Sequence, residues 1–301
     1  MLNLTEKEKA RYAEMVRGGL ETSPVTEGEY FKVFDEVRST EAKVRARDGY
    51  EIPVWIIKPL DGEPADYVFM NIHGGGFVRE HSKFDSAFCS YLVKRLRCTV
   101  VDVDYRLAPE YPYPTGLQDG YDVYKWVMDH AEELGARSDR IVIGGNSSGG
   151  QFSAAIPMMA AKAGDPIPAL SVMMYPVCSM NTVESISDDL DLSDVSNRGL
   201  LYNLLYCTKE SDFDDPYVSL LKATKEDLEK FPPLILATGG QDPLAPDSEE
   251  FAKQVAQASG SRVAVRRFKN SKHGFLNRCL GDEWAEGREF VFSEIEYMMS
   301  K

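Results

Sequence analysis

The glycine-rich hexapeptide Gly145–Gly150 constrains the fold of this chain more than any other segment. It reads Gly-Asn-Ser-Ser-Gly-Gly, follows the apolar run Ile141–Ile143 and precedes a helical pattern over 148–163. So short a turn between a strand and a helix demands backbone angles that favour glycine, because glycine has no Cβ. The pattern predicts a serine exposed on a sharp strand-to-helix turn, as in a nucleophile elbow.

The glycine frame selects one of the two serines. Ser147 has glycine two residues away on both sides, at Gly145 and Gly149, whereas Ser148 has Asn146 upstream. A Gly-x-Ser-x-Gly match occurs by chance in about a tenth of chains this long, so a glycine-rich helix start that binds an anion is an alternative. A dinucleotide fingerprint fails because Asn146 interrupts the spacing, and the sequence has no phosphate-loop Gly-Lys-Ser/Thr.

Apolar strands alternate with amphipathic helices along most of the chain. Strands are expected at 67–72, 99–103, 140–144, 170–175, 234–238 and 263–268, and helices at 82–97, 117–129, 148–163, 246–258 and 282–299. A hairpin is expected at 44–46 and 52–57, joined through Asp48-Gly49. This alternation predicts an α/β class with a mostly parallel central sheet and helices on both faces.

The alternation stops in a stretch rich in Asp, Ser and Asn. We interpret residues 180–225 as an insertion that forms a cap over the core, and residues 41–179 and 226–301 as that core. Residues 1–40 form an N-terminal cap segment. It opens with Thr5 and Glu8 at capping-box spacing, which predicts a helix there.

Composition restricts the partners of this chain. Its formal net charge of −14 gives attraction to nucleic acid or to an anionic membrane the wrong sign, so we expect neither as partner. The five cysteines are scattered, odd in number and without a Cys-x-x-Cys pair. That pattern favours reduced thiols in a cytoplasmic protein over disulfides or a zinc site.

No segment predicts targeting or membrane insertion. The start of the chain lacks the apolar run of a secretory signal, and no apolar stretch approaches the roughly 20 residues that span a bilayer. We expect no cofactor and no metal. The acidic runs 189–194 and 212–215 are interpreted as solvated surfaces, with a calcium site as the less favoured alternative. The sequence leaves a homodimer open.

A second glycine-rich segment follows the strand expected at 67–72. It reads His73-Gly74-Gly75-Gly76 and can bring backbone N–H groups close to a substrate. We expect an oxyanion hole formed by the N–H groups of Gly75, Gly76 and Ser148. His73 is expected to orient this loop by hydrogen bonding and not to transfer protons.

The order of the remaining groups selects the base and the acid. On this type of sheet the serine comes first, then the acid, then the histidine, and His273 is the only histidine after Ser147. The preferred acid is Asp242, which lies in a turn after the strand at 234–238. Asp247 and Glu249 are the alternatives, although acidic residues at a helix start commonly serve the helix dipole.

These motifs together resemble the hormone-sensitive-lipase-like group of α/β-hydrolase esterases, the bacterial family IV. The matching pieces are His73–Gly76 with Phe77, Asp104–Glu110 with Pro112 and Pro114, Gly145–Gly150, Asp242–Leu244 and His273–Phe275. The resemblance implies an α/β-hydrolase fold, a helical cap and a serine carboxylesterase acting on short acyl chains. The chain departs from the usual elbow at Asn146, where an acidic residue is common, and at Ser148, where alanine is common.

The expected reaction is hydrolysis of short-acyl, neutral carboxylic esters through an acyl-enzyme, since an acidic cap would repel anions. The candidate substrate contacts are Phe77, Tyr202 and Tyr206, although aromatic residues in a cap also form cores of their own. The segment 105–110 is expected to brace the oxyanion loop. A serine amidase, peptidase or lactonase uses the same groups, and a non-catalytic binding protein is the less favoured alternative.

Overall fold

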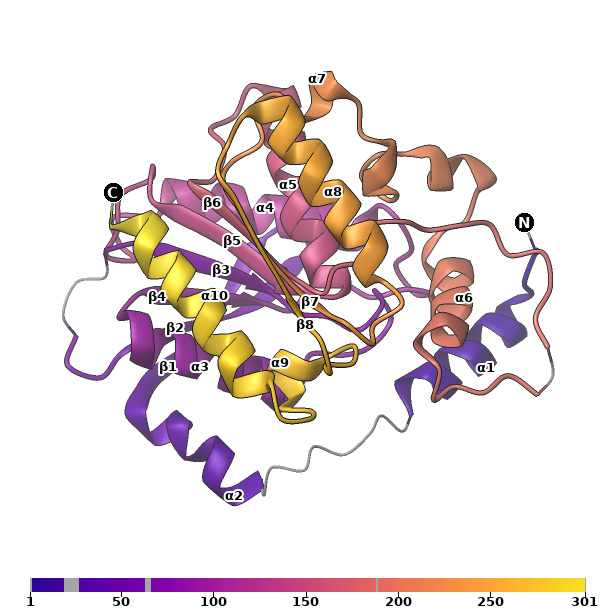
Figure 1. The fold of residues 1–301 in the computed structure, drawn as a ribbon, viewed down its shortest axis with the longest axis horizontal. Coiled ribbons are helices and arrows are strands. Elements are labelled where there is room, and N and C mark those ends of the chain that lie inside the picture. The colour runs from indigo at the N-terminus through magenta and orange to yellow at the C-terminus, as the bar shows by residue number, and fades with distance from the viewer. Residues whose placement is uncertain (1, 19–26, 63–65, 188, 301) are drawn as a thin grey trace.

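One eight-stranded sheet organises the part of the chain that the computed structural model describes, residues 2–18, 27–62, 66–187 and 189–300 (Figure 1). In spatial order its strands are β1 (Val37–Arg45), β2 (Glu51–Pro59), β4 (Thr99–Val103), β3 (Val68–Ile72), β5 (Ile141–Asn146), β6 (Leu170–Met174), β7 (Leu234–Gly239) and β8 (Val263–Phe268). β2 runs antiparallel to β1 and β4, and the other neighbouring strands are parallel.

Helices cover both faces of the sheet, as the apolar strands predict. α4 (Thr115–Asp129), α5 (Ser148–Ala163) and α8 (Ala245–Ser259) cover one face. α3 (Lys83–Leu96) and α10 (Trp284–Met299) cover the other. All residues of β3 to β7 are consequently buried.

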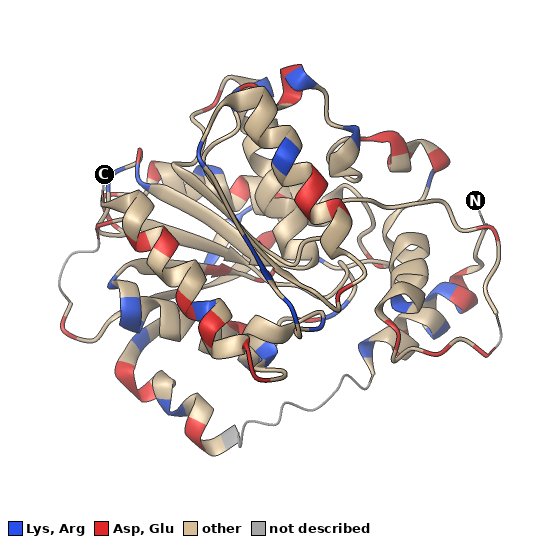
Figure 2. Ribbon diagram, in the orientation of Figure 1, with Lys and Arg blue, Asp and Glu red and all other residues tan. Residues whose placement is uncertain are grey.

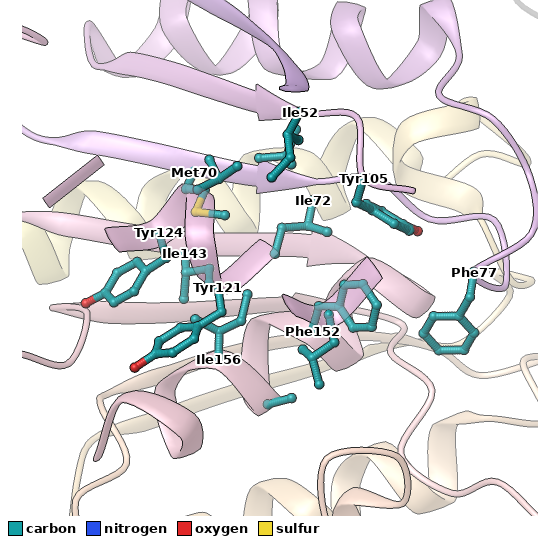
Figure 3. Close-up of a cluster of buried hydrophobic side chains, with 14 of the residues drawn as sticks. Ile52, Met70, Ile72, Phe77, Tyr105, Tyr121, Tyr124, Ile143, Phe152 and Ile156 are labelled. Carbon is teal, nitrogen blue, oxygen red and sulfur yellow. The ribbon is translucent and has the colours of Figure 1, made fainter. Parts of the chain in front are cut away.

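The cluster on the first face lies beneath the turn that carries Ser147. Figure 3 shows Ile72 of β3 and Ile143 of β5 together with Phe152 and Ile156 of α5, and all four are fully buried. The helix that follows the serine is therefore anchored to the sheet by its apolar face. Because the helix is held in place by this burial, the turn at its start is held in place as well.

Two segments that are distant in the sequence lie side by side where the sequence predicts a cap (Figure 1). The chain between β6 and β7 contains α6 (Val195–Tyr206), the 3-10 turns η2 (Glu210–Asp214) and η3 (Leu220–Lys222), and α7 (Lys225–Leu228). α6 lies beside α1 (Glu6–Arg17), away from the helices that cover the sheet (Figure 1). Thr5 caps α1 with Glu8 in the expected capping box.

The rest of the described N-terminal segment does not join this cap. α2 (Glu27–Tyr30) and the 3-10 helix η1 (Phe31–Glu36) lie against α3, where Tyr30 and Val33 form a small buried cluster with Ala87. β1 begins at Val37, so residues 37–40 pair with β2 in the sheet. The cap segment placed at 1–40 is therefore too long, because Tyr30 and Val33 pack against α3 and residues 37–40 belong to the sheet.

The cysteines match the expected reduced state. Cys89, Cys98, Cys178, Cys207 and Cys279 are all free and buried. Burial raises the pKa of the Cys89 thiol well above its usual range. No helix within the described ranges is both long and apolar enough to cross a membrane. The cytoplasmic location and the homodimer stay predictions.

Candidate active site

Ser147 lies in the turn between β5 and α5 with φ 55° and ψ −117°, a conformation that few residues other than glycine adopt. The flanking glycines make this turn possible. A Cβ on Gly149 would lie 1.9 Å from the carbonyl oxygen of Ile72, and one on Gly145 would lie 2.4 Å from that same atom. The elbow is therefore held tightly against the end of β3, at the carboxyl edge of the sheet.

Three side chains from three loops meet at this edge. His273, which follows β8, places Nε2 2.9 Å from Oγ of Ser147. Its Nδ1 lies 2.7 Å from Oδ2 of Asp242, which follows β7 and is buried. These contacts can orient the imidazole and let it accept the hydroxyl proton of Ser147. The structure thus brings together the three residues that the sequence singled out.

Backbone contacts hold the acid beside the histidine loop. The N–H group of Gln241 donates to the carbonyl oxygen of Ser271 over 2.9 Å, joining the two loops. The second carboxylate oxygen of Asp242 accepts from the N–H group of Leu244 over 3.0 Å. Both oxygens of Asp242 are consequently engaged, which fixes the carboxylate toward His273.

The two alternative acids have other surroundings. Glu249 accepts hydrogen bonds from Arg267 Nε over 2.6 Å and from the Thr238 hydroxyl over 2.9 Å. The Arg267 guanidinium lowers the pKa of Glu249. Asp247 lies in the first turn of α8. The imidazole contacts Asp242 because this residue lies in the turn between β7 and α8, at the edge of the sheet. Asp247 and Glu249 lie farther along the chain, within α8.

The glycine segment after β3 presents two unpaired N–H groups. Gly75 has φ 132° and Gly76 has φ 61°, in the region that favours glycine. Neither N–H group has an acceptor among the described residues. Ser148 opens α5, where the first turn of a helix leaves its N–H groups without carbonyl partners. Within the described residues, none of the three predicted donors is thus paired with a backbone carbonyl group.

Asn146 joins this segment to the elbow. Its Oδ1 accepts a hydrogen bond from the N–H group of Gly74 over 2.8 Å. The two backbones also approach closely, since a Cβ on Gly74 would lie 2.7 Å from the carbonyl oxygen of Asn146. Asn146 stands where the usual elbow sequence has an acidic residue, and its side-chain amide supplies the acceptor that holds residues 73–76. We call these residues the oxyanion segment.

His73 and Tyr105 hold the same segment in place through stacking and hydrogen bonds. The His73 ring is fully buried, its Nδ1 lies 2.7 Å from the carbonyl oxygen of Gly74, and it stacks on Tyr105 with centroids 4.4 Å apart. The Tyr105 hydroxyl donates to the carbonyl oxygen of His73 over 3.0 Å. Burial lowers the pKa of His73. These contacts fit the bracing role expected for both residues.

Comparison with known proteins identifies the family. Residues 69–277 match the family described as alpha/beta hydrolase fold. The chain belongs to this family. It is 33% identical over 261 residues to carboxylic ester hydrolase LipN of Mycobacterium tuberculosis, covering 83% of this chain and 68% of that protein. It is 34% identical over 137 residues to hormone-sensitive lipase of Mus musculus, covering 46% of this chain and 18% of that protein.

A solved structure extends the likeness to the whole fold. The hyperthermophilic esterase from Pyrobaculum calidifontis superposes with a TM-score of 0.79 at 26% identity, covering 97% of this chain and 93% of that one. This α/β-hydrolase belongs to the hormone-sensitive-lipase-like esterases. The expected fold and a carboxylic ester hydrolase are thereby confirmed.

In this α/β-hydrolase a cavity of about 390 Å³ lies in front of Ser147. Its wall combines the oxyanion segment, the elbow, the histidine loop and α6 of the cap. Tyr202 of α6 lies directly over the oxyanion segment, because a Cβ on Gly76 would be 2.3 Å from its ring. Phe77 also lines the cavity. The cap therefore forms one side of the site.

Tyr206, the third predicted substrate contact, does not line this cavity. It is 1% exposed and stacks on Phe77 with ring centroids 3.9 Å apart. Tyr113 and Phe152 contact the same ring. The prediction for Tyr206 is wrong because, one helical turn after Tyr202, α6 reaches the aromatic core.

Arg17 at the end of α1 connects the cap to the oxyanion segment. Its guanidinium donates to the carbonyl oxygens of Val78 over 3.0 Å and of Ala108 over 3.1 Å. It also forms an ion pair with Glu110 over 2.6 Å, which raises the pKa of Arg17. The segment that braces the oxyanion loop is thus tied to the N-terminal helix.

The charges of the cavity differ from those of the outer cap. The residues of the acidic runs 189–194 and 212–215 do not line the cavity, and Figure 2 shows acidic residues along the chain around α6. Three arginines, Arg79, Arg198 and Arg278, line it together with three carboxylate residues, Glu80, Asp85 and Asp247. Sequence reasoning missed them, although Arg79 and Arg278 lie a few residues after predicted site residues. No group of three or more His, Cys, Asp or Glu side chains in the described ranges could hold a metal ion.

Proposed function

We propose that this chain hydrolyses short-acyl carboxylic esters through an acyl-enzyme formed on Ser147. The contact series from Asp242 to His273 to Ser147, beside a cavity bordered by unpaired N–H groups, carries the proposal. It supplies the nucleophile, the base and the charge stabiliser that acyl transfer requires.

The reaction has two steps. Nε2 of His273 takes the proton of the Ser147 hydroxyl while Oγ attacks the ester carbonyl carbon, and the carbonyl oxygen becomes an oxyanion. As the carbonyl re-forms, the alcohol leaves with the proton from His273, and Ser147 keeps the acyl group. Water, deprotonated by His273, then releases the acid and restores the serine. Asp242 stabilises the imidazolium in both steps.

The N–H groups of Gly75, Gly76 and Ser148 donate hydrogen bonds to the oxyanion. Each donor of this kind contributes about 3 to 4 kcal/mol to the transition state. Their positions do not depend on a mobile side chain, since they belong to the backbone of a braced loop and of a buried helix. This arrangement favours charge development on the carbonyl oxygen.

Cavity size supports the predicted short acyl chain. A volume of about 390 Å³, with Tyr202 closing one side, accommodates a small ester. The predicted preference for neutral esters rested on the acidic runs of the cap. Because those runs do not line the cavity, they give no support for neutral esters. The size of the cavity supports the short acyl chain.

A burst experiment tests the proposal. With 4-nitrophenyl acetate in rapid mixing, we expect a burst of nitrophenolate equal to the enzyme concentration, and mass spectrometry of the quenched protein should find the acetyl group on Ser147. Ser147→Ala should abolish the burst and lower kcat by about 10⁶. Unchanged turnover by the purified variant would refute the assignment.

Matched substrates separate the alternative activities. A 4-nitrophenyl ester and the 4-nitroanilide of the same acid share acyl group and ring, and we expect kcat/KM for the ester to be higher by at least about a thousandfold, because 4-nitroaniline is a poorer leaving group than 4-nitrophenol. Comparable turnover of the anilide would favour an amidase.

A further inference from the structure

Tyr175, the residue directly after β6, combines a large side chain with a backbone conformation that favours glycine. Its φ is 39°. A bulky residue is strained in this region, and such strain persists where the surrounding structure requires it. The side chain is 1% exposed and belongs to the wall of the cavity that Ser147 lines. A strained tyrosine at this position indicates a role in the site.

The backbone on both sides of Tyr175 holds the nucleophile. The N–H group of Ser147 donates to the carbonyl oxygen of Met174 over 2.9 Å, and the carbonyl oxygen of Ser147 accepts from the N–H group of Val177 over 3.3 Å. The N–H group of Tyr175 itself donates to the carbonyl oxygen of Ala237 on β7 over 2.7 Å. The segment around Tyr175 therefore joins the elbow to the strand that precedes the acid.

The Tyr175 ring packs against the imidazole of His273. The two ring centroids lie 5.2 Å apart and the ring planes meet at 69°, an edge-to-face contact that aromatic rings favour. The nitrogens of the same imidazole contact Ser147 and Asp242. The tyrosine ring thus adds a third point of contact to the two hydrogen bonds of the imidazole.

The Tyr175 hydroxyl holds the helix that follows the histidine loop. It donates to Oδ1 of Asn277 over 2.8 Å and accepts from the N–H group of the same residue over 3.4 Å. Asn277 lies on α9 (Phe275–Arg278), which begins two residues after His273. Burial raises the pKa of Tyr175, so the hydroxyl keeps its proton and remains a donor. One side chain therefore contacts the histidine loop at the imidazole and again at α9.

A buried carboxylate fixes the orientation of the Asn277 amide. Nδ2 of Asn277 donates to Oδ1 of Asp85 over 3.0 Å. Oδ2 of Asp85 accepts from the N–H group of Ser82 over 3.0 Å and from its hydroxyl over 2.6 Å. Because a carboxylate only accepts, the NH₂ group of Asn277 faces Asp85 and the amide oxygen faces Tyr175. The start of α3 thereby anchors the acceptor of the Tyr175 hydroxyl.

We propose that Tyr175 is a positioning residue that keeps the imidazole of His273 aligned during ester hydrolysis, and that Asn277 holds Tyr175 in place. The inference rests on the proposed function. There, Nε2 of His273 accepts the proton of the Ser147 hydroxyl and then gives it to the leaving oxygen as the C–O bond breaks. The second transfer matters most when the leaving alcohol is a weak acid, because such an alcohol leaves poorly as its anion. Loss of alignment should therefore be greatest for poor leaving groups.

Two acetate esters of similar size test this expectation, since phenol is a weaker acid than 4-nitrophenol. In Tyr175→Phe, which keeps the ring and removes the hydroxyl, we expect kcat/KM to fall about threefold for 4-nitrophenyl acetate and about tenfold for phenyl acetate. Tyr175→Leu removes the ring as well and should widen the difference. The ratio of the two values is insensitive to the fraction of folded enzyme. Equal losses for the two esters in both variants would overturn the proposal.

Tyr124→Phe is the matched control. Tyr124 is also 1% exposed and its hydroxyl donates to the carbonyl oxygen of Pro166 over 2.9 Å, but it does not line the cavity. This variant should keep the wild-type ratio of the two esters. A change as large as that in Tyr175→Phe would contradict a specific role of Tyr175, because loss of any buried tyrosine hydroxyl would then have the same effect.

Asn277→Ala tests whether the hydroxyl acts through α9. The variant removes the acceptor of the Tyr175 hydroxyl, so it should change the ester ratio as Tyr175→Phe does. The double variant Tyr175→Phe/Asn277→Ala should change the ratio no further, because both substitutions break the same hydrogen bond. A wild-type ratio in Asn277→Ala, or additive effects in the double variant, would overturn the part assigned to Asn277.

Nuclear magnetic resonance separates this inference from the proposed reaction. Nδ1 of His273 faces the Asp242 carboxylate, which favours the neutral tautomer with its proton on Nδ1. With ¹⁵N-labelled histidine, and His273→Ala for assignment, wild type and Tyr124→Phe should show the two well-separated nitrogen shifts of that tautomer. In Tyr175→Leu the two shifts should approach each other, as in an exchanging mixture. If the wild-type protein turned over no ester, the proposed function would fail, and these shifts would still decide the inference. Unchanged shifts in Tyr175→Leu would refute it.

Discussion

At the scale of single residues, one amide oxygen links the nucleophile turn to the oxyanion segment. Asn146 accepts from the N–H group of Gly74, two residues before the second predicted donor. Oxyanion stabilisation depends on donors that are already in place before charge develops. A change at Asn146 should therefore act on the chemical step more than on substrate binding.

We expect Asn146→Ala to lower kcat about tenfold and to change KM little, because the Gly74 N–H group loses its acceptor and the donor segment loosens. Asn146→Asp retains an acceptor oxygen at this place, now on a carboxylate, and should keep kcat within a few-fold of the wild type. Steady-state kinetics with 4-nitrophenyl acetate measure both. If the alanine and aspartate variants behaved alike, the hydrogen bond would have no catalytic part.

At the scale of elements, the oxyanion segment and α6 of the cap are fitted to each other at Gly76. The Tyr202 ring occupies the space that any side chain there would need. The positive φ of this residue adds a smaller cost, since alanine adopts that region at about 1 kcal/mol. The close fit between Gly76 and the Tyr202 ring therefore determines the position of the oxyanion segment.

Gly76→Ala should lower kcat about a hundredfold, because the methyl group displaces the donor segment from the ring. Removing the ring in the double variant Gly76→Ala/Tyr202→Ala should restore part of the loss. The four proteins of this cycle, compared by kcat/KM, give the coupling energy between the two positions. Additive effects would show that the clash is not the cause.

α1 acts on the same segment through Arg17. Arg17→Ala removes two hydrogen bonds and the ion pair with Glu110, so α1 should detach more readily and limited proteolysis at the N-terminal segment should accelerate. We expect kcat/KM to fall about threefold to tenfold. Lys9→Ala is the control, because it removes an ion pair with Glu6 within the same helix. Equal proteolysis rates for the two variants would contradict a connecting role.

At the scale of the whole molecule, a buried charged pair ties the sheet to the segment before α3. Nε2 of His81 lies 2.7 Å from Oδ2 of Asp102 on β4, and Asn71 on β3 donates to the other oxygen over 2.7 Å. Burial opposes the charge of His81, but Asp102 outweighs it and raises the pKa to about 9. Folding therefore favours the protonated imidazole.

Stability should depend on pH accordingly. Because the folded-state pKa of His81 lies above the unfolded value of about 6.5, its contribution is complete below pH 6.5 and is lost as the pH rises through about 9. We expect the free energy of unfolding to fall by on the order of 2 kcal/mol across this range. Urea titrations at several pH values measure it. Asp102→Asn should flatten the slope, whereas parallel curves for the two proteins would exclude the pair as its source.

Much of the site was accessible from the sequence because its signals are local. The glycines around Ser147 and at Gly75 and Gly76 are required by backbone angles and close approaches that any chain in these turns must satisfy. Elimination among four histidines left His273, which contacts Ser147 in the structure. Asp242 was chosen for its place after a strand, and parallel strands bring such turns to one edge.

Other features depended on contacts between distant segments. The run Tyr30–Glu36 carries no sign of whether it joins the cap or the core, and its aromatic side chains decide by burial against α3. Tyr202 and Tyr206 share one face of α6, yet one meets the cavity and the other meets the core. Periodicity gives the face of a helix and not the partner that the face meets.

The sequence by itself determined the strand-and-helix order, the elbow with its glycines, and the three residues proposed as nucleophile, base and acid, because each follows from local backbone geometry or from the order of residues along a parallel sheet. Only the tertiary structure decided the charge of the cavity. Arg79, Arg198 and Arg278 lie far apart in the chain among 34 basic residues, and no local pattern distinguishes them from solvated surface arginines. Folding places them around one cavity, because residues far apart in the sequence become neighbours only through the packing of the elements that carry them.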